Sequence, residues 1–130
     1  MILPTTLCMA AAASILAAWL MIRVGKVRLG ENVLIGDGGN DMVTRRMRAH
    51  ANFVENTPFA LILVAAIEFA GKGDPWLPVV AALFIFGRVA HAFGMDGGAL
   101  EKGRLIGTLI TLLTHLGLAI AAVLIVLGVI

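Results

Sequence analysis

Residues 45 to 58 read RRMRAHANFVENTP, and an apolar run from Phe59 to Ala70 follows them directly. Together, this polar stretch and the run predict one membrane helix. Charged groups are costly in hydrocarbon unless they are paired or face a polar cavity. The stretch therefore predicts either a functional site or a polar network that packs helices. At about 100° per residue, four of its polar side chains share one helical stripe: Arg45, Arg48, Asn52 and Glu55.

The composition of the chain sets its class. Of the 130 residues, 60% are hydrophobic and 14% are charged, whereas charged residues supply about a quarter of an average soluble chain. The mean hydropathy is +0.99. We therefore expect residues 1–130 to form one all-α domain, a bundle of four transmembrane helices in the lipid bilayer.

Charge and cysteine content argue against other classes. The net charge of +2 is small, and the cations stand beside apolar spans, so we expect no nucleic-acid partner. Cys8 is the one cysteine, which leaves no intrachain disulfide. The run from Gly36 to Gly39 is a turn signal, because it lacks the lysine and the preceding strand of a phosphate-binding loop.

Four apolar segments are long enough to cross a bilayer. We interpret the first as a retained helix, because a cleaved signal peptide would carry its basic residues before the apolar run, and here they follow it. A loop from Gly25 to Asn40 separates it from the second helix, which Asn40 or Asp41 caps. The predicted spans are Met1–Ile22, Asp41–Ala70, Trp76–Gly94 and Gly103–Ile130.

The distribution of cations predicts the topology. All of the ten lysines and arginines except Lys72 flank the first or the third connection between helices. The positive-inside rule then places both connections in the cytoplasm and both termini in the periplasm. The polar ends of the second, third and fourth helices are therefore expected on the cytoplasmic side.

The third helix adds two polar residues to this side. Arg88 and His91 are three residues apart and share a face. Because the second and third helices are antiparallel, both residues would lie near the polar stripe. We therefore expect a shared cluster in which Arg88 or His91 meets the stripe residues Arg48, Asn52 and Glu55.

The remaining polar residues indicate packing. Gly103 and Gly107 form a small-residue step that Thr111 continues, which predicts close helix contact. We interpret His115 as a hydrogen-bonded packing residue and not a metal ligand, because no second ligand is spaced to join it. Glu68 is expected to be a carboxylate at the membrane interface.

The polar residues resemble the signature of a known family. Gly87-Arg88-Val89-x-His91 resembles a third-helix motif of the MAPEG family, the membrane-associated proteins of eicosanoid and glutathione metabolism, and Arg104 matches an arginine at the start of its fourth helix. The resemblance covers the chain from about Gly36 to Gly107. Within the family, the sequence looks most like an uncharacterised bacterial inner-membrane branch. The second-helix signature is matched by Arg45-x-x-Arg48-Ala49-His50-x-Asn52-x-x-Glu55-x-x-Pro58.

The resemblance implies a homotrimer in the bacterial inner membrane. It implies glutathione as co-substrate between neighbouring subunits, and transferase or peroxidase activity on a hydrophobic small molecule. Arg104 would be the catalytic residue, because a guanidinium favours the nucleophilic thiolate. Arginines would suit the two carboxylates of glutathione, and Glu55 its ammonium group. The implied glutathione-binding residues are Arg48, Asn52, Glu55, Arg88 and His91.

The sequence departs from the family pattern at several positions. Ala51 stands where the characterised enzymes often carry an arginine, and Leu105 stands where a serine can follow the fourth-helix arginine. The chain has no tyrosine, and Met95 and Thr108 occupy the positions of two family tyrosines. The region from Arg23 to Arg28 is a candidate source of another cation.

Two other functions stay open on the sequence. The chain could form a non-catalytic trimeric membrane scaffold or binding protein. It could also be a small transporter, although such exporters usually need a membrane-embedded carboxylate in an early span, and Met1 to Ile22 has none.

Overall fold

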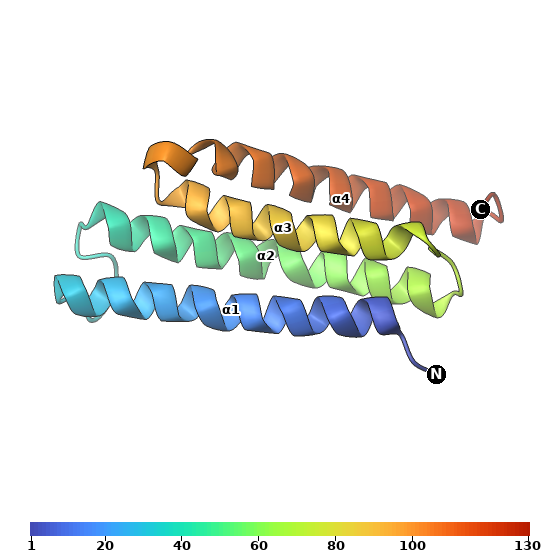
Figure 1. Ribbon diagram of the computed structural model, residues 1–130, viewed down its shortest axis with the longest axis horizontal. Helices are drawn as coiled ribbons and strands as arrows, with labels where there is room; N and C mark the ends of the chain where they lie inside the picture. Colours follow the sequence, from blue (N-terminus) through green and yellow to red (C-terminus); the bar gives the residue numbers. More distant parts are fainter.

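Four long helices make up the protein. The computed structural model describes residues 1–130 as α-helical throughout, apart from connections and ends (Figure 1). The all-α fold class is therefore confirmed, and each helix is long and apolar enough to cross a membrane. The elements are α1 (Pro4–Glu31), α2 (Asp41–Phe69), α3 (Trp76–Met95), the short 3-10 turn η1 (Gly98–Leu100) and α4 (Lys102–Val126).

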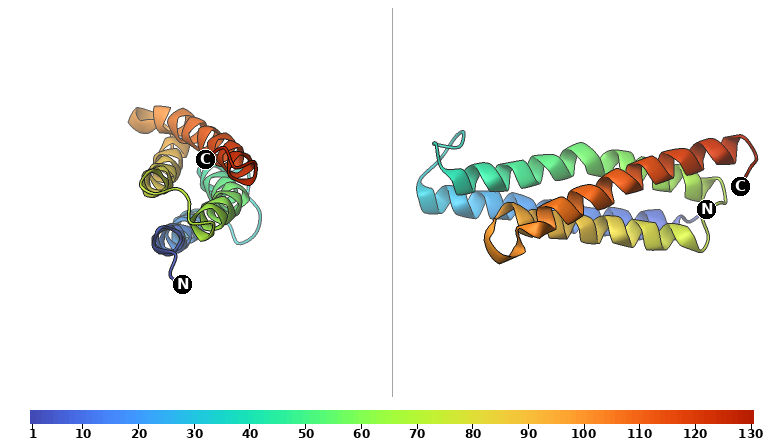
Figure 2. Two further views of the ribbon diagram at one scale, coloured as in Figure 1. Left: turned by 90° about the vertical axis from the view of Figure 1, so that its right-hand side faces the viewer. Right: turned by 90° about the horizontal axis from the view of Figure 1, so that it is seen from above.

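The helices run alternately up and down. Both chain ends and the α2–α3 connection lie at one end of the bundle, and the two cation-rich connections lie at the other (Figure 1). The backbones of α1 and α4 do not approach each other closely, and α2 and α3 lie between them on opposite sides (Figure 2, left). The outward faces of α2 and α3 therefore point in opposite directions.

The limits of the first connection differ from the prediction. Helix α1 continues past Ile22 to Glu31, so the loop begins at Asn32 and not at Gly25. Asn32 ends the helix in the left-handed conformation, with φ 55°, and its backbone N–H faces the carbonyls of Arg28 and Leu29. The apolar run predicts only the edge of the hydrocarbon core, whereas helical backbone hydrogen bonds do not need apolar side chains and continue to Glu31. The predicted cap of α2 is confirmed, since Asn40 Oδ1 accepts from the Val43 N–H at 3.0 Å.

Small residues bring α3 and α4 into close contact, as predicted. A Cβ added to Gly107 would lie 2.3 Å from the Gly87 carbonyl oxygen and 2.6 Å from the His91 Cβ. A Cβ on Gly94 would lie 2.0 Å from the Arg104 nitrogen. This contact fixes the start of α4, and with it Arg104, against the end of α3.

Glu68 joins α1 to α2 at the opposite end of the bundle. Its carboxylate accepts the backbone N–H groups of Thr5 and Thr6, both at 2.8 Å, and the Thr6 hydroxyl at 2.7 Å. The prediction of an interfacial carboxylate is therefore incomplete, because Glu68 caps the first turn of a neighbouring helix.

Candidate functional site

Arg88 is the centre of a polar cluster at the cation-rich end. Its side chain is 2% exposed. One guanidinium nitrogen donates to Asn52 Oδ1 on α2, and another donates to the Gly107 carbonyl on α4 at 2.8 Å. Arg88 therefore ties three helices together and fixes the orientation of the Asn52 amide. Its Nε is buried and has no partner.

His91 lies one turn beyond Arg88 on the same buried face of α3. It is 5% exposed and packs against Gly107. Unlike Arg88, its ring makes no hydrogen bond. The predicted shared face of Arg88 and His91 is confirmed, and the ring nitrogens of His91 have no hydrogen-bond partner within the chain.

The polar stripe of α2 divides into two edges, which corrects the prediction of one shared cluster. On one edge Asn52 bonds to Arg88, and Arg45 Nη1 donates to the Met95 carbonyl at 3.4 Å. On the other edge Arg48 and Glu55 are exposed and make neither a hydrogen bond nor an ion pair within the protomer. The two edges differ by about 60° around the helix, and that rotation is enough to turn one toward α3 and the other outward.

Arg104 lies in the first turn of α4, at the same end of the bundle. Its side chain is exposed and forms no ion pair. The Thr108 hydroxyl, one turn further on, donates back to the Arg104 carbonyl at 2.8 Å. Arg104 therefore presents an unpaired guanidinium, and the hydroxyl nearest along the helix is already bonded.

A partly buried ion cluster beside this site was not predicted from the sequence. Arg23 on α1 pairs with Asp96, just beyond the end of α3, and donates to the Ala92 carbonyl at 3.3 Å. Arg46 Nε lies 3.5 Å from the other Asp96 oxygen, and Arg46 Nη1 donates to the Arg23 carbonyl at 3.4 Å. A signal was present, because Arg46 lies off the polar stripe and needs a different partner.

His115 bonds deep in the bundle, where the sequence predicted a packing residue. Its Nδ1 lies 2.8 Å from the Thr111 carbonyl and its Nε2 lies 3.1 Å from the Asn56 carbonyl. Asn56 lies two residues before Pro58, which has no backbone N–H to donate within α2. His115 therefore supplies a hydrogen bond near the proline, and the predicted packing role is confirmed.

The fold and the site together define a small integral membrane protein of four antiparallel helices with a polar cluster at one end. The chain belongs to the MAPEG family, whose model matches residues 6–124. This agrees with the resemblance seen in the second, third and fourth helices.

The chain is also similar to an Escherichia coli protein named inner membrane protein YecN. The two are 28% identical over 85 residues, in both strain K12 and strain O6:H1 CFT073. The match covers 62% of this chain and 65% of YecN, which is slightly less than two thirds of that relative.

Proposed function

We propose that this protein binds glutathione between neighbouring copies of a homotrimer in the bacterial inner membrane, and that it transfers or oxidises the thiol in reactions with hydrophobic small molecules. The observation that carries the proposal is that Arg48 and Glu55 are exposed and unpaired on a membrane helix. The inner-membrane location follows the printed name of YecN. The cation distribution favours periplasmic termini and a cytoplasmic site.

The unpaired charges support the proposal of a second copy and a ligand. A charge at bilayer depth costs roughly 2.5–3.5 kcal/mol on insertion scales unless it finds a partner. Glutathione has two carboxylates and one ammonium group, so it can pair with Arg48 and Glu55 at the same time. A neighbouring subunit would cover the rest of the outward α2 face.

The buried members of the cluster would orient the ligand. Asn52 is held by Arg88, which itself is anchored on Gly107. Its amide is therefore preorganised to bond the peptide groups of glutathione. Arg88 contributes mainly by holding Asn52, and the free ring of His91 offers one further bond.

Arg104 would favour the thiolate form of glutathione. At an effective dielectric of about 20, two opposite charges ~4 Å apart gain ~4 kcal/mol before desolvation is counted. Each pKa unit is about 1.4 kcal/mol, so a fraction of this energy lowers the thiol pKa by one or two units. The thiolate sulfur then attacks an electrophilic carbon, a C–S bond forms, and the leaving group departs with its bonding electron pair.

Thiolate absorbance tests this proposal. Glutathione added to purified protein at neutral pH should raise the ultraviolet thiolate band. Arg104→Leu should abolish the band, and Arg104→Lys should keep part of it, because the lysine retains the charge without the planar fork. Lys102→Leu removes a neighbouring exposed cation and is the matched control. A full thiolate band in Arg104→Leu would contradict the catalytic role of Arg104.

One observation favours a non-catalytic glutathione-binding trimer as the second candidate. Thr108 occupies a position where the family carries a tyrosine, and its hydroxyl is used by the Arg104 carbonyl. Calorimetry separates the two functions. Glutathione binding that is lost in Asn52→Leu, without any thiolate band in the unmodified protein, would indicate the binding protein. Absence of both binding and band would overturn both.

A further inference from the structure

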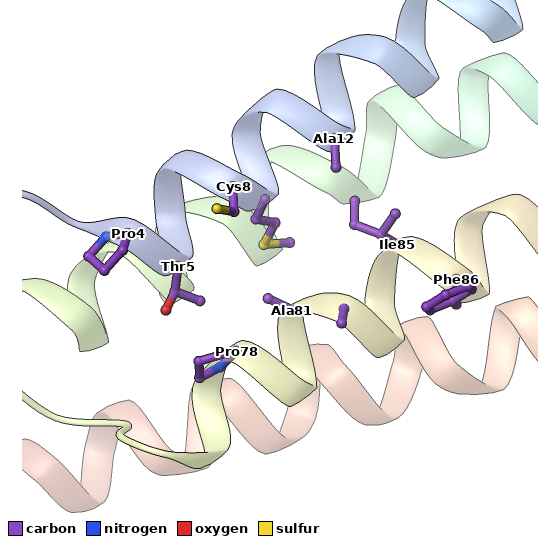
Figure 3. Close-up of a pocket in the computed structure, with 10 residues that line it drawn as sticks. Pro4, Thr5, Cys8, Ala12, Pro78, Ala81, Ile85 and Phe86 are labelled. Carbon is purple, nitrogen blue, oxygen red and sulfur yellow. The ribbon is translucent and has the colours of Figure 1, made fainter.

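An apolar groove runs between α1 and α3, away from the glutathione site proposed above. Its larger hollow, about 500 Å³, lies toward the chain ends and is drawn in Figure 3. A second hollow of about 380 Å³ continues it toward the cation-rich end. Ala12 and Ile85 line both hollows, so the two are continuous.

Small side chains create the groove. Ala12 on α1 and Ala81 and Ala82 on α3 all line the gap, and Ala12 lies across from Ile85 (Figure 3). The lining is almost entirely apolar, and Thr5 is its one residue with a polar side chain. Protein interiors are normally packed to crystal-like density. An apolar groove of this size on a membrane-facing surface would lose dispersion contacts if it were empty, so we expect another apolar molecule to fill it.

The length of the groove fits a lipid chain. Pro4 and Trp19 mark its two ends on α1. The fifteen residue steps between them correspond to ~22 Å at 1.5 Å per residue. One leaflet of the hydrocarbon core is about 15 Å thick. The groove is longer than this, so an acyl chain that enters at the Trp19 end can lie in it through the whole depth of the leaflet.

Aromatic and cationic groups border the Trp19 end of the groove. The rings of Trp19 and Phe93 are 5.3 Å apart. The Arg23 guanidinium carbon lies 4.7 Å from the Trp19 ring centroid and 5.6 Å from that of Phe93. Tryptophan and arginine at this level are typical of the boundary between hydrocarbon and headgroups.

This end carries excess positive charge. Arg23 and Arg46 share one carboxylate, that of Asp96, so the three groups leave one positive charge unbalanced. Lys26 is exposed and lies three residues beyond Arg23, on the same stripe of α1 as Trp19. A phosphate at headgroup level would complement these charges.

We propose that the α1–α3 groove binds one acyl chain of an anionic phospholipid, whose phosphate lies against Lys26 and the Arg23–Arg46 pair. The groove lies between α1 and α3, on the side of the bundle away from α2 (Figure 2, left), and α2 carries the exposed Arg48 and Glu55 of the proposed trimer contact. A lipid in this groove therefore leaves the proposed trimer contact free. The proposal does not depend on glutathione binding.

Tryptophan fluorescence tests the occupant, because Trp19 lines the groove and Trp76 lies in a separate hollow between α3 and α4. In the Trp76→Phe protein, reconstituted in vesicles, bromine on the acyl chains should quench Trp19. Brominated phosphatidylglycerol should do so at a mole fraction about fivefold lower than brominated phosphatidylcholine, since each basic residue near the surface attracts anionic lipid by ~1 kcal/mol. In the Trp19→Phe protein, Trp76 should show no such preference.

Two substitutions separate the chain from the charge. Ala12→Phe should fill the groove and remove the preferential quenching, whereas Ala11→Phe, at an exposed position one residue away, should not. Ala82→Phe, at an exposed position on the other wall, repeats the test should Ala12→Phe not fold. Lys26→Gln should reduce the preference for phosphatidylglycerol, and Lys72→Gln, at the opposite end, should leave it unchanged.

Three results would overturn the proposal. Equal quenching by the two lipids would exclude a selective anionic site. Unchanged quenching in the groove-filling variants would exclude the groove. Cross-linking of Cys8 to Cys8 by a bifunctional maleimide in the intact membrane would place a second copy of the chain in the groove in place of a lipid.

Discussion

The bond between Glu68 and the start of α1 should contribute measurably to stability. The first N–H groups of any helix lack an intrahelical partner. In α1 two of them, those of Thr5 and Thr6, are satisfied by one carboxylate from α2. Glu68→Ala would leave both N–H groups and the Thr6 hydroxyl without this acceptor, and it would remove this side-chain link between α1 and α2.

The magnitude follows from the three bonds. A hydrogen bond to a charged group contributes about 1.5–3 kcal/mol, but these three share one side chain, are partly buried and do not add. Loss of a helix cap costs about 0.5–2 kcal/mol. We therefore expect Glu68→Ala to lower the free energy of unfolding by ~2 kcal/mol. Glu68→Gln, which keeps one acceptor oxygen without the charge, should cost ~1 kcal/mol.

Thermal unfolding in detergent measures this effect. For a domain of this size, ~2 kcal/mol corresponds to a fall in Tm of roughly 6–10 °C. Glu31→Ala is the matched control, because Glu31 is an exposed glutamate at the other end of α1 and makes no side-chain hydrogen bond. Equal Tm values for the Glu68 and Glu31 variants would refute the capping role. Thr6→Val should cost less than Glu68→Ala, since both backbone bonds survive.

Three further predictions concern packing, charge and topology. Gly107→Val should cost at least ~2 kcal/mol of stability because its Cβ would meet the Gly87 carbonyl at 2.3 Å, whereas Gly117→Ala, with open space around it, should be neutral or stabilising. Asp96→Asn should lower Tm, because Arg23 is buried and would lose its countercharge, while Asp41→Asn at an exposed pair should change it little. A fluorescent protein that folds only in the cytoplasm should stay dark when fused after Ile130; bright fusions would reverse the topology.

The sequence was sufficient to predict the helices. Each span is a long apolar run, and each connection between spans contains glycine, asparagine or proline. It also predicted the close helix contact at Gly103 and Gly107, since small residues four positions apart in a membrane helix are typical of close helix packing. It did not predict the end of α1, because hydropathy detects the edge of the hydrocarbon and not the end of a helix. The ion pairs of Arg23 and Arg46 with Asp96 depend on how three helices pack. The residue spacing within one helix does not show how that helix packs against the others.

The division of the α2 stripe shows why a site can be recognised from sequence and still be incomplete in one chain. Asn52 has a partner inside the fold, so Arg88→Leu should disturb the protomer itself. Arg48 and Glu55 have none, so Arg48→Leu or Glu55→Gln should leave the stability of an isolated protomer nearly unchanged. These two substitutions should instead weaken glutathione binding, which calorimetry measures, and trimer assembly, which cross-linking measures. If Arg48→Leu unfolds the protein as strongly as Arg88→Leu, then Arg48 serves the fold, and the outward edge of α2 is not a binding surface.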